Sequence, residues 1–439
     1  MAKPIIEKAP KFEISAFEYD VDYLKYKATD EKGRYLYWDK FKWRVKNDDP
    51  IKAWFATKWE RLRNQKSIEL LDEKGKAFVF CVPDTLEAKL FQISNLVGKG
   101  IVPPNSIKNR YLISSLVMEE AISSSQLEGA STTRKVAKDI LVSKRKPKSM
   151  DEEMIVNNYL LMKELKRVKQ EELSLDMMLE FHRIATKNLD SNGNVEGTFR
   201  QHDDIVITDG TDENILHQPP SFKSLTKRLQ KLCDFANKNH SGKEGELFIH
   251  PIIKAVILHF MIGYEHPFSD GNGRTARAIF YWYMLKNGFD YFEYVSISKL
   301  LKEAPKQYAL SYMYTEIDDN DLTYFIYYQM DIIIRAIDEL LEYLEVKGEA
   351  FEEITELLRG SSLSESLNFL QKDIIQKSIK SPGRVFIVSE IASDYDVSIN
   401  SARKYLSELV QLKILAQYKD GRTISYVALE NLYKVLKSK

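Results

Sequence analysis

The chain has 439 residues, with 64 basic and 64 acidic side chains, so its formal net charge is zero. This length allows two to four domains with a sizeable core, and the neutral balance excludes the global basic field that proteins coating nucleic acid carry. Only two cysteines, no apolar N-terminal segment and no apolar run of membrane-spanning length argue against a disulfide-rich secreted protein or a membrane protein, so we expect a cytoplasmic one.

Residues 1–98 predict a small mixed α/β region. The runs 35–38 and 77–82 are rich in β-prone side chains and predict strands, while residues 51–71 have the apolar spacing of a helix. The many aromatic residues suit a protein core better than a stacking platform for nucleic acid. Glycines and a Pro-Pro pair at 98–104 mark the end of the region.

Residues 99–330 are predicted to be mainly helical. The expected helices cover 111–129, 150–170, 174–188 and 221–239. One stretch departs from this pattern, because Ile205, Val206 and Ile207 are β-branched and an Asp-Gly turn signal follows them, which predicts a β-hairpin. Residues 331–378, rich in Glu, Leu, Ile and Lys, predict a helical connector.

The segment 379–439 has the pattern of a winged helix-turn-helix. A short helix near 389–392, a turn and a second helix over 400–409 are followed by two β-prone runs around an Asp-Gly turn. In proteins of this type the second helix enters the major groove of DNA. DNA is therefore a candidate partner of residues 379–439, and a protein-contact module is the alternative.

The most informative segment, 266–277, reads HPFSDGNGRTAR. Gly271 and Gly273 let the backbone bend and present N–H groups to an anion. The residues after them read as a helix, whose N-terminus attracts phosphate. Arg274 and Arg277 are three residues apart and share one face of that helix. This set of groups suits a polyphosphate bound with a divalent metal ion.

The segment resembles the signature of the Fic family, HPFx(D/E)GNGRxxR, at every fixed position. The resemblance implies a Fic-type helical core that transfers AMP from ATP to a Ser, Thr or Tyr hydroxyl of a protein, a reaction called AMPylation. It implies ATP and Mg²⁺ as cofactors and a protein substrate, the chain itself included. The reverse removal of AMP and a homodimer both stay open.

The resemblance also implies a role for each motif residue. His266 is the expected general base, and Asp270 is the expected ligand of Mg²⁺. The phosphates are expected to bind to the turn and to the helix after it, at Asp270, Gly271, Asn272, Gly273, Arg274 and Arg277. The hairpin at Ile205, Val206 and Ile207 resembles the flap with which Fic proteins hold a target segment by strand addition.

A second short motif lies upstream. Residues 124–129 read SSQLEG and resemble the inhibitory motif (S/T)xxxE(G/N) of the Fic family, on a helix near 111–129. Ser124 and Glu128 are four residues apart and share a helix face. The resemblance implies that Glu128 pairs with Arg277 and takes the guanidinium that the γ-phosphate of ATP needs.

Three weaker interpretations of these residues stay open. Residues 271–276 fit the dinucleotide pattern GxGxxA, which requires a preceding strand, although residues 252–264 have helical spacing. His250, His259 and His266 lack the spacing of a zinc site. The chain is alternatively a winged-helix transcription regulator that uses the Fic unit as a nucleotide sensor.

Overall fold

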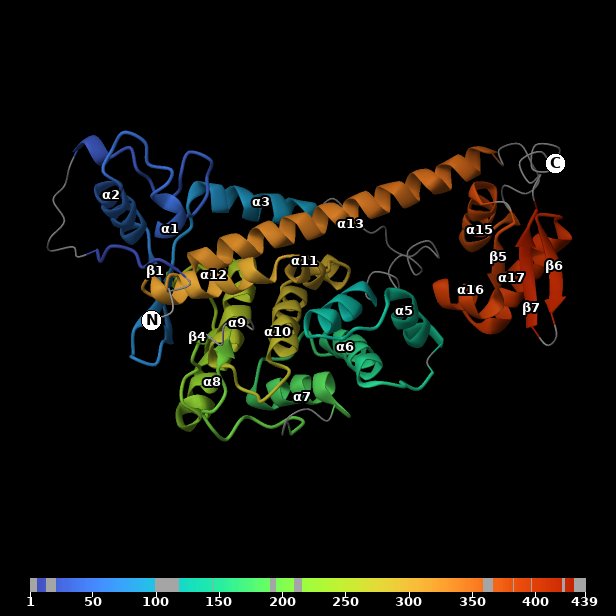
Figure 1. The fold of residues 1–439 in the computed structure, drawn as a ribbon, viewed down its shortest axis with the longest axis horizontal. Helices are drawn as coiled ribbons and strands as arrows, with labels where there is room; N and C mark the ends of the chain where they lie inside the picture. The colour runs from blue at the N-terminus through green and yellow to red at the C-terminus, as the bar shows by residue number, and fades with distance from the viewer. Residues whose placement is uncertain are drawn as a thin grey trace. The chain divides into compact units, whose positions relative to one another are not determined.

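The computed structural model describes residues 6–12, 21–98, 118–143, 145–189, 195–208, 215–357, 366–381, 383–395, 397–420 and 423–429. These residues are mainly helical, with small antiparallel sheets (Figure 1). Unit 1 comprises Met1–Lys99, Leu160–Phe292 and Leu300–Arg335, and unit 2 comprises Gly100–Tyr159, Glu293–Lys299 and Ala336–Lys439.

The N-terminal part of unit 1 combines helices with one hairpin, as its sequence predicts. It contains α1 (Trp38–Phe41), α2 (Pro50–Arg63), β1 (Lys66–Leu71), β2 (Ala77–Phe80) and α3 (Asp84–Gly98). The start of α2 follows from its sequence, because the Asp49 side chain accepts hydrogen bonds from the amides of Ile51 and Lys52 and proline occupies the first helical position. Strand β1 pairs antiparallel with β2.

Two local predictions for this region are wrong. Residues 35–38 form no strand, because α1 begins at Trp38 and the rings of Tyr35 and Tyr37 pack on Tyr324 and Tyr314. The helix predicted over 51–71 ends at Arg63, and β1 follows it. In β1 the burial alternates, with Ile68 and Leu70 inside, which is the period of a strand.

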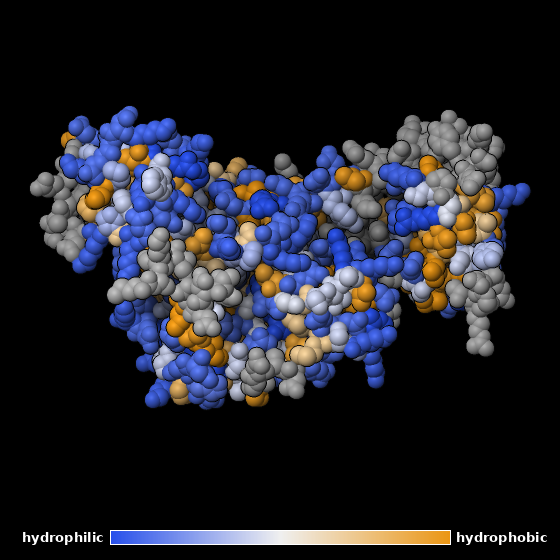
Figure 2. Space-filling view, in the orientation of Figure 1, coloured by the Kyte–Doolittle hydropathy of each residue, from blue (hydrophilic) through white to orange (hydrophobic). Residues whose placement is uncertain are grey.

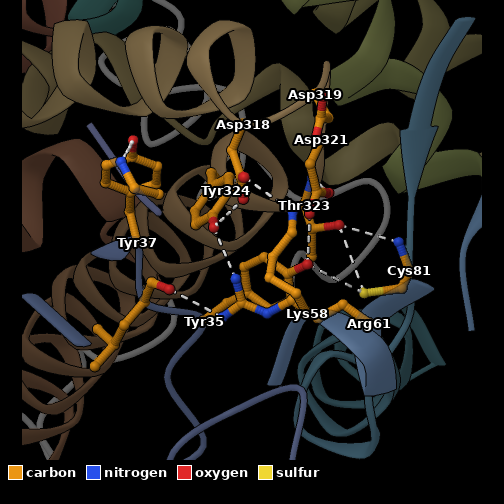
Figure 3. A network of polar contacts seen from close by, with 12 residues as sticks. Tyr35, Tyr37, Lys58, Arg61, Cys81, Asp318, Asp319, Asp321, Thr323 and Tyr324 are labelled. Atoms are coloured by element: carbon orange, nitrogen blue, oxygen red, sulfur yellow. Dashed lines mark hydrogen bonds and ion pairs between the residues drawn. The ribbon is translucent and has the colours of Figure 1, made fainter. Parts of the chain in front are cut away.

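A buried polar network fastens this region to the segment that joins α12 (Pro305–Ile317) to α13 (Thr323–Leu357) (Figure 3). Lys58 donates to Asp318 at 2.9 Å, and Asp318 also accepts from the Tyr324 hydroxyl at 2.7 Å. The Arg61 guanidinium donates to that hydroxyl at 2.7 Å. Since each buried charge has a partner, the network avoids the several kcal/mol that an unpaired buried ion costs, about 3–5 when one partner is removed.

The rest of unit 1 is a helical core whose central element is α9 (Pro251–Glu265). The other helices of this core include α7 (Leu175–Thr186), α8 (Phe222–Asn237), α10 (Asn272–Lys286) and α12. Helix α9 is apolar and buried almost all round, as expected for the middle helix of a core, and it packs along α10. The predicted helix starts at 174 and 221 are confirmed, because Ser174 and Ser221 occupy the N-cap positions of α7 and α8.

The predicted hairpin is confirmed, although its strands are short. Strand β3 (Ile207–Thr208) pairs antiparallel with β4 (Ile215–His217). Of the three predicted strand residues only Ile207 belongs to β3. Ile205 and Val206 precede it outside the strand, because the pairing register begins at Ile207 opposite His217. The predicted turn at 209–210 lies outside the described residues.

In unit 2, residues 118–127 are helical and pack with α5 (Arg134–Ser143) and the start of α6 (Met150–Arg167) around Met118, Ile122 and Ile155. Its C-terminal elements are α15 (Phe369–Lys380), β5 (Val385–Ile387), α16 (Val388–Asp394), α17 (Ile399–Gln411), β6 (Leu415–Asp420) and β7 (Thr423–Ala428). Their sheet has the order β5-β7-β6 and shares one hydrophobic core with these helices.

The remaining described helices are η2 (Val21–Tyr23), η3 (Asp290–Glu293) and α11 (Ile297–Glu303). No helix in the described ranges is both long and apolar enough to cross a membrane. On the face drawn in Figure 2, hydrophilic residues dominate and the hydrophobic residues form separate patches.

Candidate active site

The site is built on the C-terminus of α9, where His266 caps the helix. The backbone of His266 is left-handed, with φ of 45° and ψ of 59°, and its amide donates to the Ile262 carbonyl at 3.0 Å. This conformation costs a residue with a side chain about 1–2 kcal/mol, so the surroundings must hold it. The imidazole Nδ1 lies 3.3 Å from the Gly263 carbonyl oxygen. An N–H at Nδ1 suits this contact and leaves Nε2 as the basic nitrogen.

Arg200 holds the left-handed residue in place from the base of the hairpin. Its Nε donates to the His266 carbonyl at 3.0 Å, and its own amide donates to the Pro267 carbonyl at 2.9 Å. The rest of the guanidinium donates to the Asp203 carboxylate and to the carbonyls of His202 and Pro220. One arginine side chain, 1% exposed, thus joins the two ends of the hairpin segment to the backbone of His266.

Asn272 closes the turn that follows. Its Oδ1 accepts from the Phe268 amide at 2.9 Å, and its Nδ2 donates to the Phe268 carbonyl at 2.8 Å. The side chain amide therefore ties the turn together, and α10 begins at this residue. The predicted contact of Asn272 with phosphate is not required for the turn to form, since the structural contacts of its side chain are with Phe268.

His182 of α7 also holds the turn between α9 and α10 in place. Its ring stacks on Phe268 with centroids 3.8 Å apart and planes within 1°. Its Nδ1 accepts from the Gly197 amide at 3.0 Å, so Nε2 carries the proton that bonds the Asp270 carbonyl at 2.9 Å. Burial lowers the pKa of His182 to about 4, against an opposing effect of that carbonyl. The ring is therefore neutral at pH 7, with one tautomer.

Gly271 is the N-cap of α10 and needs to be glycine. Its φ is 78°, and a Cβ on it would lie 2.7 Å from the Thr186 side chain. The motif requires a glycine at position 271, and the positive φ and the close approach of Thr186 explain why. The turn brings the amides of the first turn of α10 to one helix N-terminus, the region of a helix that binds anions.

Asp270 and the two motif arginines lie on either side of this helix start. The Asp270 carboxylate, 40% exposed, pairs with Arg274 at 2.8 Å. Arg274 also donates to the Ala185 carbonyl at 2.7 Å, and both Arg274 and Arg277 are buried. The motif therefore places carboxylate and guanidinium groups at one helix start. The contacts with Asp270 and with the Ala185 carbonyl fix the orientation of the Arg274 side chain.

The side chains of this site can hold Mg²⁺ only when a bound phosphate compound supplies further oxygen ligands. Asp270 offers one partly exposed carboxylate, and no cluster of three or more His, Cys, Asp or Glu able to hold a metal ion occurs in the described part of the chain. Mg²⁺ commonly binds through one or two carboxylates with substrate phosphates completing its shell. The residues present fit that arrangement.

The residues of the second motif lie in unit 2. Ser124 is buried in the helix 118–127, and Glu128 is half-buried in the turn directly after it. Gly129 follows with φ of 103°, the left-handed conformation expected where glycine ends a helix. The helical part of the prediction is thus confirmed for residues 118–127, and residues 111–117 lie outside the described ranges.

Two weaker interpretations do not survive. The dinucleotide pattern requires a strand before Gly271, and the element there is the helix α9. His259 bonds the Tyr308 hydroxyl at 2.8 Å, and burial lowers its pKa to about 3. His250 accepts from the Ile252 amide as the cap of α9. These histidines have structural roles, which argues against a shared zinc site.

Sequence reasoning missed Arg200, His182 and His217. Their partners lie 66, 88 and 99 residues away in the chain, at His266, Asp270 and Glu316. No short motif contains both members of such pairs. The available signals were weak ones, namely an arginine directly before the predicted hairpin and a histidine in a helix of apolar period.

The part of the chain that builds this site resembles known proteins. Residues 172–284 match the Fic/DOC family. The chain is 24% identical over 217 residues to "Protein adenylyltransferase Fic" of Nematostella vectensis, covering 44% of this chain and 46% of that protein. It is 33% identical over 121 residues to "Protein adenylyltransferase fic-1" of Caenorhabditis elegans, covering 28% and 21%. It therefore spans less than half the length of these relatives.

The fold has a match among solved structures. The crystal structure of a Fic family protein from Desulfovibrio desulfuricans G20 superimposes with a TM-score of 0.52 at 15% identity. The match covers 80% of this chain and 97% of that one. At this identity the match supports the arrangement of the helices and no detail of the chemistry.

Proposed function

Because the chain carries a domain of the Fic/DOC family, we propose that it is a protein adenylyltransferase, which transfers AMP from ATP to a hydroxyl of a protein side chain. One observation carries the proposal. The basic nitrogen of His266 and the start of α10, where helix amides favour an anion, belong to one turn that Arg200, His182 and Asn272 hold in shape.

In the proposed reaction the target hydroxyl oxygen attacks the α-phosphorus of ATP. His266 takes the hydroxyl proton, a new P–O bond joins AMP to the protein, and the bond to the β-phosphate breaks to release pyrophosphate. The amides at Gly271–Gly273 stabilise charge on the α-phosphoryl group, and Arg274 and Arg277 bind the β- and γ-phosphates. Catalysis then rests on positioning and on charge stabilisation.

Two further groups complete this proposal. Mg²⁺, held by Asp270 and the phosphates, would neutralise charge on the nucleotide. The hairpin of β3 and β4 would receive the target, because its sheet has only these two strands among the described residues and Ile215 of β4 is 61% exposed. An extended target segment would add to such an edge through backbone hydrogen bonds. The same histidine supports hydrolytic removal of AMP when water replaces the hydroxyl.

The first prediction concerns His266. In His266→Ala, transfer of labelled AMP to the chain itself or to lysate proteins should fall by about 10²–10⁴-fold, because the general base is lost. ATP binding, measured by calorimetry, should persist. His202→Ala is the control, since His202 is an exposed histidine at the hairpin base. Undiminished labelling by His266→Ala would refute the assignment.

We further propose that Glu128 restrains this activity by pairing with Arg277. The support comes from the SxxxEG string and from the local geometry of its helix end, where Gly129 is left-handed and Glu128 is half-buried. A carboxylate and a guanidinium form a charge-assisted pair that competes with the γ-phosphate for the same donor. ATP then binds in a pose that does not react.

The second prediction tests this restraint. Glu128→Gly should raise self-labelling about ten- to hundredfold, since losing one charge-assisted pair removes ~1.5–3 kcal/mol of competition. Glu128→Gln, which removes the charge and keeps the side chain length, should raise it less. Arg277→Ala added to Glu128→Gly should abolish the gain. Equal labelling by wild type and Glu128→Gly at all ATP concentrations would rule this restraint out.

We propose that the C-terminal segment is a winged helix that contacts DNA. The alternative function of the chain is then that of a transcription regulator. The element order β5-α16-α17-β6-β7 supports it, and Asn400, Arg403 and Lys404 of α17 are exposed. We propose that Arg422 contacts DNA as well, although it lies outside the described residues.

The third prediction follows from the exposed cations of α17. The full chain should shift duplex DNA at low salt, with affinity falling as salt rises. The double variant Arg403→Ala, Lys404→Ala should bind more weakly and with a smaller salt dependence. If the wild type shifts no duplex even at low salt, the segment is a protein-contact module instead.

A further inference from the structure

The hairpin has a second connection to the catalytic helix, through His217 at the end of β4. This histidine is buried, with its side chain 7% exposed. Its Nε2 lies 2.7 Å from the carbonyl oxygen of Tyr264, two residues before His266. Its Nδ1 lies 2.7 Å from the Glu316 carboxylate of α12. One imidazole therefore joins the hairpin, the last turn of α9 and α12.

The contact lies at the end of α9 where a cation is favoured. The last carbonyls of a helix have no partner within the helix, and the helix dipole places partial negative charge there. Nε2–H of His217 satisfies the Tyr264 carbonyl, as Arg200 satisfies that of His266. Both capping groups come from the hairpin segment, so the hairpin and the turn carrying His266 are held by the same bonds.

The two contacts fix the proton count of the pair. A carbonyl oxygen only accepts, so Nε2 must carry a proton. The short contact between Nδ1 and Glu316 requires another proton between them. The His217–Glu316 pair therefore holds one proton more than a neutral histidine beside an ionised carboxylate. If that proton leaves, two lone pairs face each other at 2.7 Å and the contact breaks.

The charged surroundings favour the protonated pair. Burial alone would lower the pKa of His217, but the hydrogen bond and charge of Glu316, the Tyr264 carbonyl and the Glu265 carboxylate outweigh it, so the pKa is raised. Arg228 of α8 faces this group too, and it pairs with Glu265 at 2.6 Å. Burial raises the pKa of the Tyr264 phenol, so that ring stays neutral. These neighbours therefore favour the protonated form of His217.

We propose that His217 is a positioning residue of the reaction, which in its protonated form ties the hairpin to the turn of His266 and needs Glu316 to do so. This rests on the proposed function, in which the hairpin receives the target and His266 takes its proton. Because the pKa of His217 is raised, the anchor weakens as the pH increases. The anchor is complete below the ordinary histidine value near 6.5 and is lost as the pH rises through the raised value.

The test is the pH dependence of AMP transfer by the full chain carrying Glu128→Gly. Its rate should fall at alkaline pH, approaching tenfold per pH unit, as the His217–Glu316 pair loses its proton. Glu316→Gln should abolish this alkaline decline, because a glutamine amide donates to neutral Nδ1 while Nε2–H still bonds Tyr264. The neutral-pH rate of that variant should drop only several-fold. His217→Leu should be slow at every pH.

Two controls separate the anchor from general stability and from the proposed activity. His202→Gln, an exposed histidine at the hairpin base, should keep the wild-type profile. Imidazole NMR titration should show His217 losing its proton above the ordinary histidine range in the wild type and within or below that range in Glu316→Gln. If this titration holds but no AMP transfer occurs at any pH, the anchor stands and the proposed activity fails.

The inference is overturned by either of two results. One is an alkaline decline that persists unchanged in Glu316→Gln. The other is a wild-type His217 that titrates at or below the ordinary histidine value.

Discussion

The left-handed residue that ends α9 is the constraint on which the rest of the site depends. His266 must leave the helix and turn at once toward the start of α10, and its backbone adopts φ of 45° to do so. This conformation costs a residue with a side chain about 1–2 kcal/mol. The residue stays there because Arg200 bonds its own carbonyl and His217 bonds the carbonyl of Tyr264, two residues earlier, both from elsewhere in unit 1.

The same bonds give the hairpin a fixed base. Arg200 joins both ends of the hairpin segment to the His266 backbone, and His217 joins its second strand to the Tyr264 carbonyl. A cation at the C-terminus of α9 is favoured by the helix dipole, just as an anion is favoured at the N-terminus of α10. The two helix ends that meet at the turn therefore impose opposite electrostatic preferences within a few residues.

The parts of this account that sequence could supply are those in which a short segment contains its own reason. The turn at 266–277 is such a segment, because the glycine at 271, the Asn272–Phe268 closure and the helix start are all local. The helix starts at Ser174 and Ser221 were predictable for the same reason. The run 35–38 was misread, since its aromatic rings are buried against Tyr314 and Tyr324, nearly 300 residues later in the chain.

The site residues that could not be predicted from the sequence are those whose partners lie far away in the chain. Arg200 is ordinary in sequence, and only the fold brings its guanidinium to His266. His182 looks like a histidine on an apolar helix face, and its two ring bonds to Gly197 and Asp270 appear only in three dimensions.

The most direct test of this account is the rate of AMP transfer in Arg200→Met, with ATP binding measured on the same folded protein. Methionine keeps the apolar stem and the backbone amide and removes the guanidinium donors that reach the His266 carbonyl and the hairpin segment. The account predicts a loss of about 10² or more in kcat, since a displacement of ~1 Å at the reacting centre has that effect, with ATP affinity little changed. Arg183→Met, at an exposed arginine of α7, should match the wild type. A folded Arg200→Met protein with wild-type kcat would contradict the account.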